Sequence, residues 1–364
     1  MSKDIAQFDS WFDPHTGPAA LVIRELLVSV EGDDGVIFPP TFAPSKDKTF
    51  PGGYNIDGPS SDGKSPNVCL IDSVGSQANR AEPIFKSKPY ATMVPQLVVV
   101  AGEHHISIFD AGHRAGDALL RCSSLAKELQ AAFRAVLKGD AWSLAKIAPT
   151  SLVFGVWDSR DTQAKLPRLV SSTIRAFNVR ELTRSAQYNP PVDYKELDVI
   201  TQSEKEKAES DSSDILAKRG YVHQPATNTH GGVIVDGEIR RDATLSLAAM
   251  QRVEAGSDEG KTRQLRRYIL GLSLVSLTAN TAAYLRQGCN LVPKLDTPRT
   301  FKIVGRDGSR EDFTLTHQDA VNYAQSVAQE FGVGKNREVP FDKTLSAKDK
   351  AAGAKSKKKA TKKK

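Results

Sequence analysis

The run from Tyr268 to Leu285 constrains the fold most, because it contains 18 consecutive residues without a charged side chain. That length is the minimum for a transmembrane helix. Hydroxyl and amide side chains interrupt the run, however, and this favours a helix buried in a large protein core. We therefore predict a core helix over residues 262–285, whose exposed start carries Arg263, Arg266 and Arg267.

The net charge of +7 comes from the C-terminal end of the chain. Residues 348–364 contain nine lysines and one aspartate, a net charge of +8, so the rest of the chain carries −1. Binding to a polyanion must therefore be judged from local clusters of cations rather than from the total. We expect residues 341–364 to form a disordered, lysine-rich tail.

The cysteines and the N-terminus indicate a cytoplasmic protein. Cys69, Cys122 and Cys289 are widely separated, which argues against a disulfide framework or a structural zinc site. The first residues lack the basic-then-apolar pattern of a signal peptide. We expect no cofactor, no bound metal and no contact with a membrane.

Strand and helix patterns alternate without a regular repeat, which predicts an α+β protein. Residues 20–30 are apolar enough to form a central strand. A loosely ordered lead-in is expected at residues 1–19, and a mobile surface loop at residues 44–66, which are rich in glycine, proline and serine. Further strands are predicted at residues 96–101, 105–109, 151–157 and 300–315, and further helices at residues 124–137, 142–147, 245–253 and 316–332.

A helix predicted after Asp72 has an unusual polar surface. Asp72 is a suitable N-cap, and Val74, Ala78, Ala81 and Phe85 repeat at helical spacing as a buried stripe. The other face offers the hydroxyl, amide and guanidinium groups of Ser76, Gln77, Asn79 and Arg80. Such groups bind phosphates and base edges. On spacing alone, an ordinary solvated helix face explains the pattern equally well.

Residues 158–188 are locally basic, with six cations and three acids. Phe177 and Tyr188 offer rings for base stacking, so the region favours contact with nucleic acid over an ordinary surface strand. The cations are Arg160, Lys165, Arg168, Arg175, Arg180 and Arg184. Residues 195–214, by contrast, hold seven acids and three bases and are predicted to be a solvated acidic insertion. Residues 220–239 are predicted to form a long hairpin or protruding loop, directly followed by Arg240 and Arg241.

Catalytic motifs are mostly missing from the sequence. It contains no P-loop, dinucleotide-binding glycine motif, HExxH motif or EF-hand loop. The segment His230–Gly232 resembles an oxyanion-hole loop, but no GxSxG motif accompanies it. A group of nearby side chains follows no metal-binding spacing: His104, His105, Asp110 and His113. A metal-independent ribonuclease that uses one of these histidines or His223 as a general base remains an alternative.

Five segments, taken in order, resemble the RAMP-superfamily backbone subunit of CRISPR type I-U (also called I-G) effector complexes. Each segment is short, and the specificity of the resemblance comes from their combination and order. The segments are Pro39–Ala43, Asp72–Glu82, Val153–Arg160, Arg168–Pro190 and His230–Leu245.

The resemblance implies a ferredoxin-like or RRM-like palm over residues 20–340, with inserted helical segments and a thumb loop, for which we predict residues 220–236. Copies of such a subunit assemble along a guide RNA (crRNA) with other Cascade subunits and present it for pairing with target DNA. Ser76, Gln77, Asn79 and Arg80 would then lie near the RNA backbone, and Arg168, Arg175, Arg180 and Arg184 would line the groove. We add Arg160, Lys165, Tyr188, His223, Arg240 and Arg241 to these predicted RNA-binding residues.

The sequence thus predicts a non-catalytic guide-RNA scaffold. Two alternatives remain. One is a RAMP-type ribonuclease that processes guide precursor or cuts target RNA. The other is a generic nucleic-acid binder that acts through the lysine-rich tail.

Overall fold

Strand β1 (Ala20–Ser29) is at the centre of the main sheet, as its apolar sequence predicts. It pairs antiparallel with β13 (Ile239–Ser246) on one side, and with β15 (Thr300–Val304) and β14 (Leu291–Pro293) on the other. The computed structural model describes residues 5–47, 49–280, 283–347 and 350. The mixture of helices and antiparallel strands confirms the predicted α+β class.

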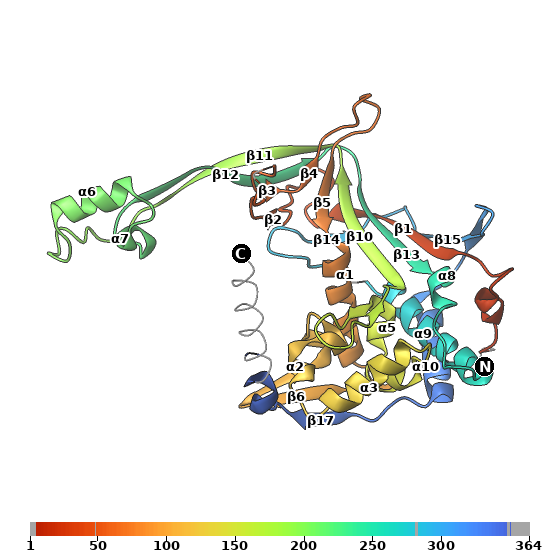
Figure 1. Cartoon of the computed structure of the whole chain (residues 1–364). Helices are drawn as coiled ribbons and strands as arrows, with labels where there is room; N and C mark the ends of the chain where they lie inside the picture. The colour runs from red at the N-terminus through yellow and green to blue at the C-terminus, as the bar shows by residue number, and fades with distance from the viewer. Residues whose placement is uncertain (1–4, 48, 281–282, 348–349, 351–364) are drawn as a thin grey trace.

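Within the described residues, eight strands form the main sheet, in the order β16-β15-β1-β13-β10-β5-β4 with β14 also paired to β1. The strands not yet given are β16 (Arg310–Phe313), β10 (Val170–Phe177), β5 (Val68–Asp72) and β4 (Ile56–Asp57). Helices cover one face of the sheet (Figure 1). They are α1 (Val74–Ala81), α5 (Thr150–Phe154), α9 (Glu259–Thr278) and α10 (His317–Phe331). We call this the helix face and the opposite one the open face.

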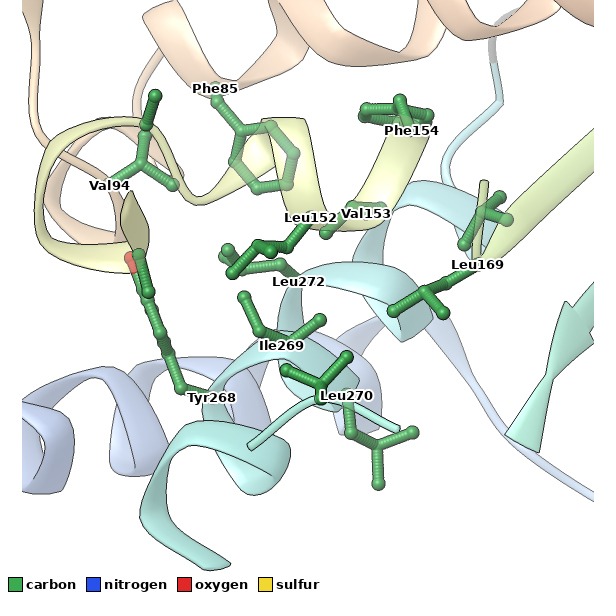
Figure 2. Close-up of a cluster of buried hydrophobic side chains, with 14 of the residues drawn as sticks. Phe85, Val94, Leu152, Val153, Phe154, Leu169, Tyr268, Ile269, Leu270 and Leu272 are labelled. Atoms are coloured by element: carbon green, nitrogen blue, oxygen red, sulfur yellow. The ribbon is translucent and has the colours of Figure 1, made fainter. Parts of the chain in front are cut away.

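Helix α9 supplies the middle of the core, and every residue from Tyr268 to Thr278 is buried. Its hydroxyl groups are satisfied inside the helix, since Ser273, Ser276 and Thr278 each donate to the carbonyl four residues earlier. Figure 2 shows Ile269 and Leu272 of α9 among the side chains of α5. None of the helices in the described part of the chain is long and apolar enough to cross a membrane.

Helix α9 ends at Thr278, earlier than predicted, where two arginines bind its last carbonyl groups. Arg241 donates to the carbonyl of Leu277 (3.0 Å), and Arg299 donates to that of Thr278 (2.8 Å). Both guanidinium groups also bind the carboxylate of Glu25 on β1, at 3.1 Å and 2.6 Å. Glu25 and Arg241 are buried. The network therefore fixes the negative end of α9 against strands β1 and β13.

A two-stranded arm projects from the sheet (Figure 1). It consists of β11 (Val179–Tyr188) and β12 (Gln224–Val235), paired antiparallel. Residues 189–223 form its tip, where α6 (Gln202–Ser210) and α7 (Ile215–Lys218) pack around a small apolar cluster. The protruding element therefore spans residues 179–235, well beyond the predicted 220–236, and the acidic insertion is its tip.

A second, three-stranded sheet lies at the far side of the helices (Figure 1). It consists of β17 (Arg337–Pro340), β6 (Leu97–Ala101) and β7 (His104–Ser107), with α2 (Ala118–Arg121), α3 (Ala126–Val136) and α4 (Trp142–Ile147) beside it. Strands β6 and β7 and helices α3 and α4 lie at the predicted positions. The described part of the N-terminal lead-in is not loosely ordered, because its short 3-10 helix η1 (Asp9–Phe12) buries Trp11 and Phe12 in the main core.

Several local predictions were wrong. Residues 151–157 form α5 and then only the short strand β8 (Val156–Trp157), because Gly155 ends the helix with a φ of 77°. Leu245 belongs to β13, and only the single-turn helix α8 (Leu247–Met250) follows it. The predicted mobile loop at residues 44–66 contains β3 (Gly53–Tyr54), paired with β2 (Thr41–Phe42), and also β4. The predicted disordered tail begins at residue 341, but residues 343–347 are helical and Phe341 forms a β-bridge with Ser123. Residues 348–349 and 351–364 of the predicted tail lie outside the described residues.

We expect Glu25→Gln to lower the free energy of unfolding by about 3 kcal/mol, because it leaves two largely buried arginines without their ionised partner. Urea or thermal unfolding of the purified chain measures the change. Arg24→Gln is the matched control, since Arg24 is the preceding residue and its ion pair with Asp242 is solvent-exposed; it should cost less than about 1 kcal/mol. Equal losses in the two variants would contradict the assigned role of Glu25.

Candidate nucleic-acid interface

A bulge in strand β5 directs the Asp72 side chain toward α1. The register of β5 against β10 shifts by one residue between Leu70 and Asp72, so Asp72 lies opposite Ile174 on the helix face. Asp72 is 1% exposed. The sequence predicted Asp72 as the N-cap of α1, and this prediction was wrong. Ser73 caps the helix by accepting a hydrogen bond from the amide of Ser76. Asp72 is thereby left to organise other side chains.

Asp72 holds two arginines that are 206 positions apart in the sequence, Arg80 and Arg286. Its Oδ2 accepts from Nε of Arg80 (3.0 Å), and its Oδ1 accepts from Nη2 of Arg286 (3.2 Å). Arg286 also donates to the carbonyl of Ile71 (3.0 Å). The two side chains are 26% and 25% exposed. We call Arg80 and Arg286 the Asp72 arginine pair.

The arginine pair is suited to bind an anion such as phosphate. Two guanidinium groups surround one carboxylate, so the cluster has a net charge of +1, and the fixed side chains lose little conformational entropy when a ligand binds. The sequence predicted Arg80 but missed Arg286. Arg286 reaches Asp72 only through tertiary folding, and no local motif around it points to this contact.

Asn79 is exposed on α1, where its carbonyl oxygen faces Arg114 (3.4 Å). Arg114 in turn forms a buried ion pair with Glu82 at 2.6 Å. Burial raises the pKa of Glu82 to about 7, and the positive charge of Arg114 opposes this rise. The ion pair joins the C-terminal end of α1 to the segment around Arg114.

Two of the predicted RNA-binding residues are buried and therefore cannot contact RNA. Gln77 is 3% exposed, and its amide lies between Asp72 (2.6 Å) and Ser172 (2.9 Å). Arg241 is 4% exposed and belongs to the Glu25 network. Their polar groups are used inside the protein. Ser76, by contrast, is half-buried on α1 near the arginine pair.

Arg160, Lys165 and Arg168 are exposed on and beside a short hairpin of β8 and β9 (Lys165–Leu166). Arg114 links this hairpin to α1, because it approaches the carbonyl of Gly155 (3.5 Å) as well as Asn79. These three predicted residues therefore lie on the same side of the sheet as α1. The hairpin also carries Trp157, which is exposed at the end of the strand predicted over residues 151–157.

Arg175 and Arg240 lie on the open face, across the sheet from the arginine pair. Ser172 contacts Gln77 on the helix face, so Arg175, an odd number of residues further along β10, projects from the other side. Arg240 is held by Glu238 (2.6 Å) and Asp242 (2.7 Å), with its guanidinium over the ring of Phe177. The predicted RNA-binding residues thus do not form one groove.

The arm carries the remaining predicted residues. Arg180 is paired with Asp236 at 2.6 Å, whereas Arg184 is exposed. Tyr188 donates to the carbonyl of Gly220 and so closes the base of the tip, and His223 is half-buried there. At the root of the arm, His230 packs on the ring of Tyr54, and its Nδ1 lies 3.3 Å from Glu181.

Among the described residues, the histidines and acids that the sequence singled out do not gather into one site. In the described part of the chain, no three His, Cys, Asp or Glu side chains gather as a metal site. Asp110 binds Lys86, while His105 and His113 face Glu338 and Asp117. A pocket of about 580 Å³ at the start of α9 has a mixed polar lining, in which four acids outnumber two arginines: Asp9, Asp13, Glu254 and Glu259 against Arg263 and Arg266.

Residues 21–181 match the family model of CRISPR-associated protein GSU0053 (Cas_GSU0053). No curated protein matches the chain. The matched part contains β1, Asp72, α1, the β8–β9 hairpin and β10, and it ends at the start of the arm. Through these elements, the chain is similar to a family of CRISPR-associated proteins, and the match supports a role in a CRISPR system.

Proposed function

We propose that this chain is a non-catalytic, guide-RNA-binding scaffold subunit of a CRISPR interference complex, in which several copies follow one guide RNA and present it to target DNA. The observation that carries the proposal is the Asp72 arginine pair beside α1. Asp72 and Arg80 lie within the part of the chain that matches the CRISPR-associated family, and Arg286 joins them from outside it. A fixed pair of guanidinium groups binds backbone phosphates without reading the bases. The bases of a guide then remain available for pairing.

The strand order supports an RRM-like palm. Strands β15, β1, β13 and β10 are neighbours in that order, α1 lies between β1 and β10 in the chain, and α9 lies between β13 and β15. This is the β-α-β-β-α-β arrangement of ferredoxin-like folds. The arm is then the thumb. Its Arg184 is a further candidate for contact with RNA phosphates.

The tip supports assembly with other protein subunits. Leu197, Val199 and Ile215 are each more than half exposed there. The surrounding residues 195–214 carry seven acids and three bases, which repel RNA. A two-stranded ribbon is also only marginally stable alone in water. An acidic and apolar tip on such a ribbon suits a protein partner, and we assign it to a neighbouring copy or another Cascade subunit.

We expect Arg80→Gln and Arg286→Gln each to reduce affinity for a single-stranded guide RNA by about tenfold, because each removes a charge-assisted contact to phosphate. The slope of log affinity against log salt should fall by about one unit per lost contact. Fluorescence anisotropy with labelled RNA measures both quantities, and a thermal melt of each variant checks that it is folded.

Arg310→Gln is the matched control, because Arg310 is an exposed cation on the open face; its affinity should stay within twofold. Arg175→Gln decides between the two faces, since the sequence alone placed Arg175 in the groove. An equal loss of RNA affinity in Arg175→Gln and Arg80→Gln would contradict our placement of the RNA on the helix face.

Truncation after Ala347 tests the alternative of a generic nucleic-acid binder. If RNA binding is lost with the lysine-rich tail but does not change in Arg80→Gln and Arg286→Gln, the tail-driven binder is favoured.

One observation favours a second candidate, metal-independent RNA cleavage. The imidazole of His230 is oriented by Glu181, an arrangement in which histidine acts as a general base. We expect the full chain to leave labelled guide precursor and target RNA intact, both with EDTA and with Mg²⁺. Gel electrophoresis measures this result. Specific cleavage that is lost in His230→Gln would instead establish the ribonuclease.

A further inference from the structure

Trp157 is the most exposed of the three tryptophans. Trp11 is buried in the main core and Trp142 is half-buried, whereas Trp157 is 56% exposed. A tryptophan side chain is seldom this exposed, because burial of the large indole ring lowers the free energy. Neither the charge pattern nor the proposed function assigned Trp157 a role.

The backbone around Trp157 is rigid. Trp157 pairs with Lys165 in the β8–β9 hairpin. The connecting turn is organised by Asp158, which is 2% exposed and accepts from both the amide (2.8 Å) and the hydroxyl (2.7 Å) of Thr162. The Asp158 amide donates to the carbonyl of Ala164 (2.9 Å). The exposed ring therefore stands on a fixed support and needs little ordering when it binds a ligand.

The surroundings of the ring are cationic. Nζ of Lys165 lies 5.4 Å from the centre of the indole. Arg160 in the turn and Arg168 just after β9 are both exposed, and Arg168 is fixed by its bond to the carbonyl of Phe154 (3.2 Å). An aromatic ring among cations suits a nucleotide, whose base stacks on the ring while its phosphates meet the positive charges. An acidic protein segment could form ion pairs with the cations, but its carboxylates offer no flat ring to stack on the indole.

Arg114 connects the β8–β9 hairpin to α1, the helix that carries Arg80 of the Asp72 arginine pair. The guanidinium of Arg114 approaches both Asn79 on α1 (3.4 Å) and the carbonyl of Gly155 (3.5 Å). Trp157 is only two residues beyond Gly155, at most about 7 Å of extended chain. A single-stranded RNA that binds along α1 can therefore reach the indole ring of Trp157.

We propose that Trp157 is a stacking platform for one unpaired nucleobase of a single-stranded RNA, with Lys165 and Arg168 on the flanking phosphates. This inference rests on the proposed function, because it takes the RNA bound beside α1 as its ligand. Stacking of this kind tolerates any base, because every base has a flat face. It would give the subunit one defined contact with a base in addition to its contacts with the backbone.

Fluorescence of Trp157 tests the proposal directly. In the full-length variant Trp11→Phe/Trp142→Phe, Trp157 is the only tryptophan. A short single-stranded RNA should quench its emission and protect it from acrylamide. Inorganic polyphosphate, which meets the same cations but has no bases, should do neither. Bound RNA that leaves the emission unchanged, or equal quenching by polyphosphate, would overturn the stacking assignment.

Affinity measurements provide a second test in the chain that keeps Trp11 and Trp142. Trp157→Leu should lose about tenfold in RNA affinity, and Trp157→Phe, which keeps a ring, should recover most of that loss. Equal affinities of the Leu and Phe variants would overturn the proposal. So would a Leu variant that binds short RNA normally but fails to form multi-subunit particles, because Trp157 would then be a protein contact.

The two proposals fail in different ways. If RNA affinity depends on Arg80 and Arg286 but not on Trp157, only the stacking inference fails. If the full chain binds no RNA in the anisotropy experiment, the proposed function and the stacking inference fail together.

Discussion

The Glu25 carboxylate, held between Arg241 and Arg299 at the end of α9, is the interaction on which the rest of the structure depends. It binds two cations that also bind the last carbonyl groups of the core helix. From Arg241 the hydrogen bonds continue through Ser172 to Gln77, and from Gln77 to Asp72. The buried network that fixes the helices to the sheet therefore also fixes the carboxylate that positions the arginine pair. Core and candidate interface are parts of one polar framework.

The distribution of charge differs between the two faces of the nearly neutral body. On the open face, Arg240 and Arg24 are compensated by the neighbouring acids Glu238 and Asp242. On the helix face, two arginines share one buried aspartate, and the β8–β9 hairpin adds further exposed cations. The acidic tip is kept away from these groups by the length of the arm (Figure 1). In our proposal, RNA would therefore bind on the helix face, and the tip is suited to a different kind of partner.

The sequence predicted the regular elements whose apolar patterns are long or well capped, including β1 and α10. It failed at residues 151–157, because residues 151–156 are buried on every side and carry no periodicity that separates a helix from a strand. It also listed Gln77 and Arg241 as RNA ligands, since composition cannot distinguish a surface arginine from one inside a buried network. Arg286 could not be found at all, because its contact with Asp72 is created by the tertiary fold. The family resemblance gathered the predicted cations into one groove, and only the structure divides them between two faces.

The central claim is that RNA follows the helix face past the Asp72 arginine pair in each of several copies. Electron cryo-microscopy of the chain co-expressed with a guide RNA tests it most directly. The account predicts multi-subunit particles in which RNA backbone density contacts Arg80 and Arg286 in every copy, on the side of the sheet that carries α1. RNA density confined to the open face, or particles without RNA despite co-expression, would contradict the claim.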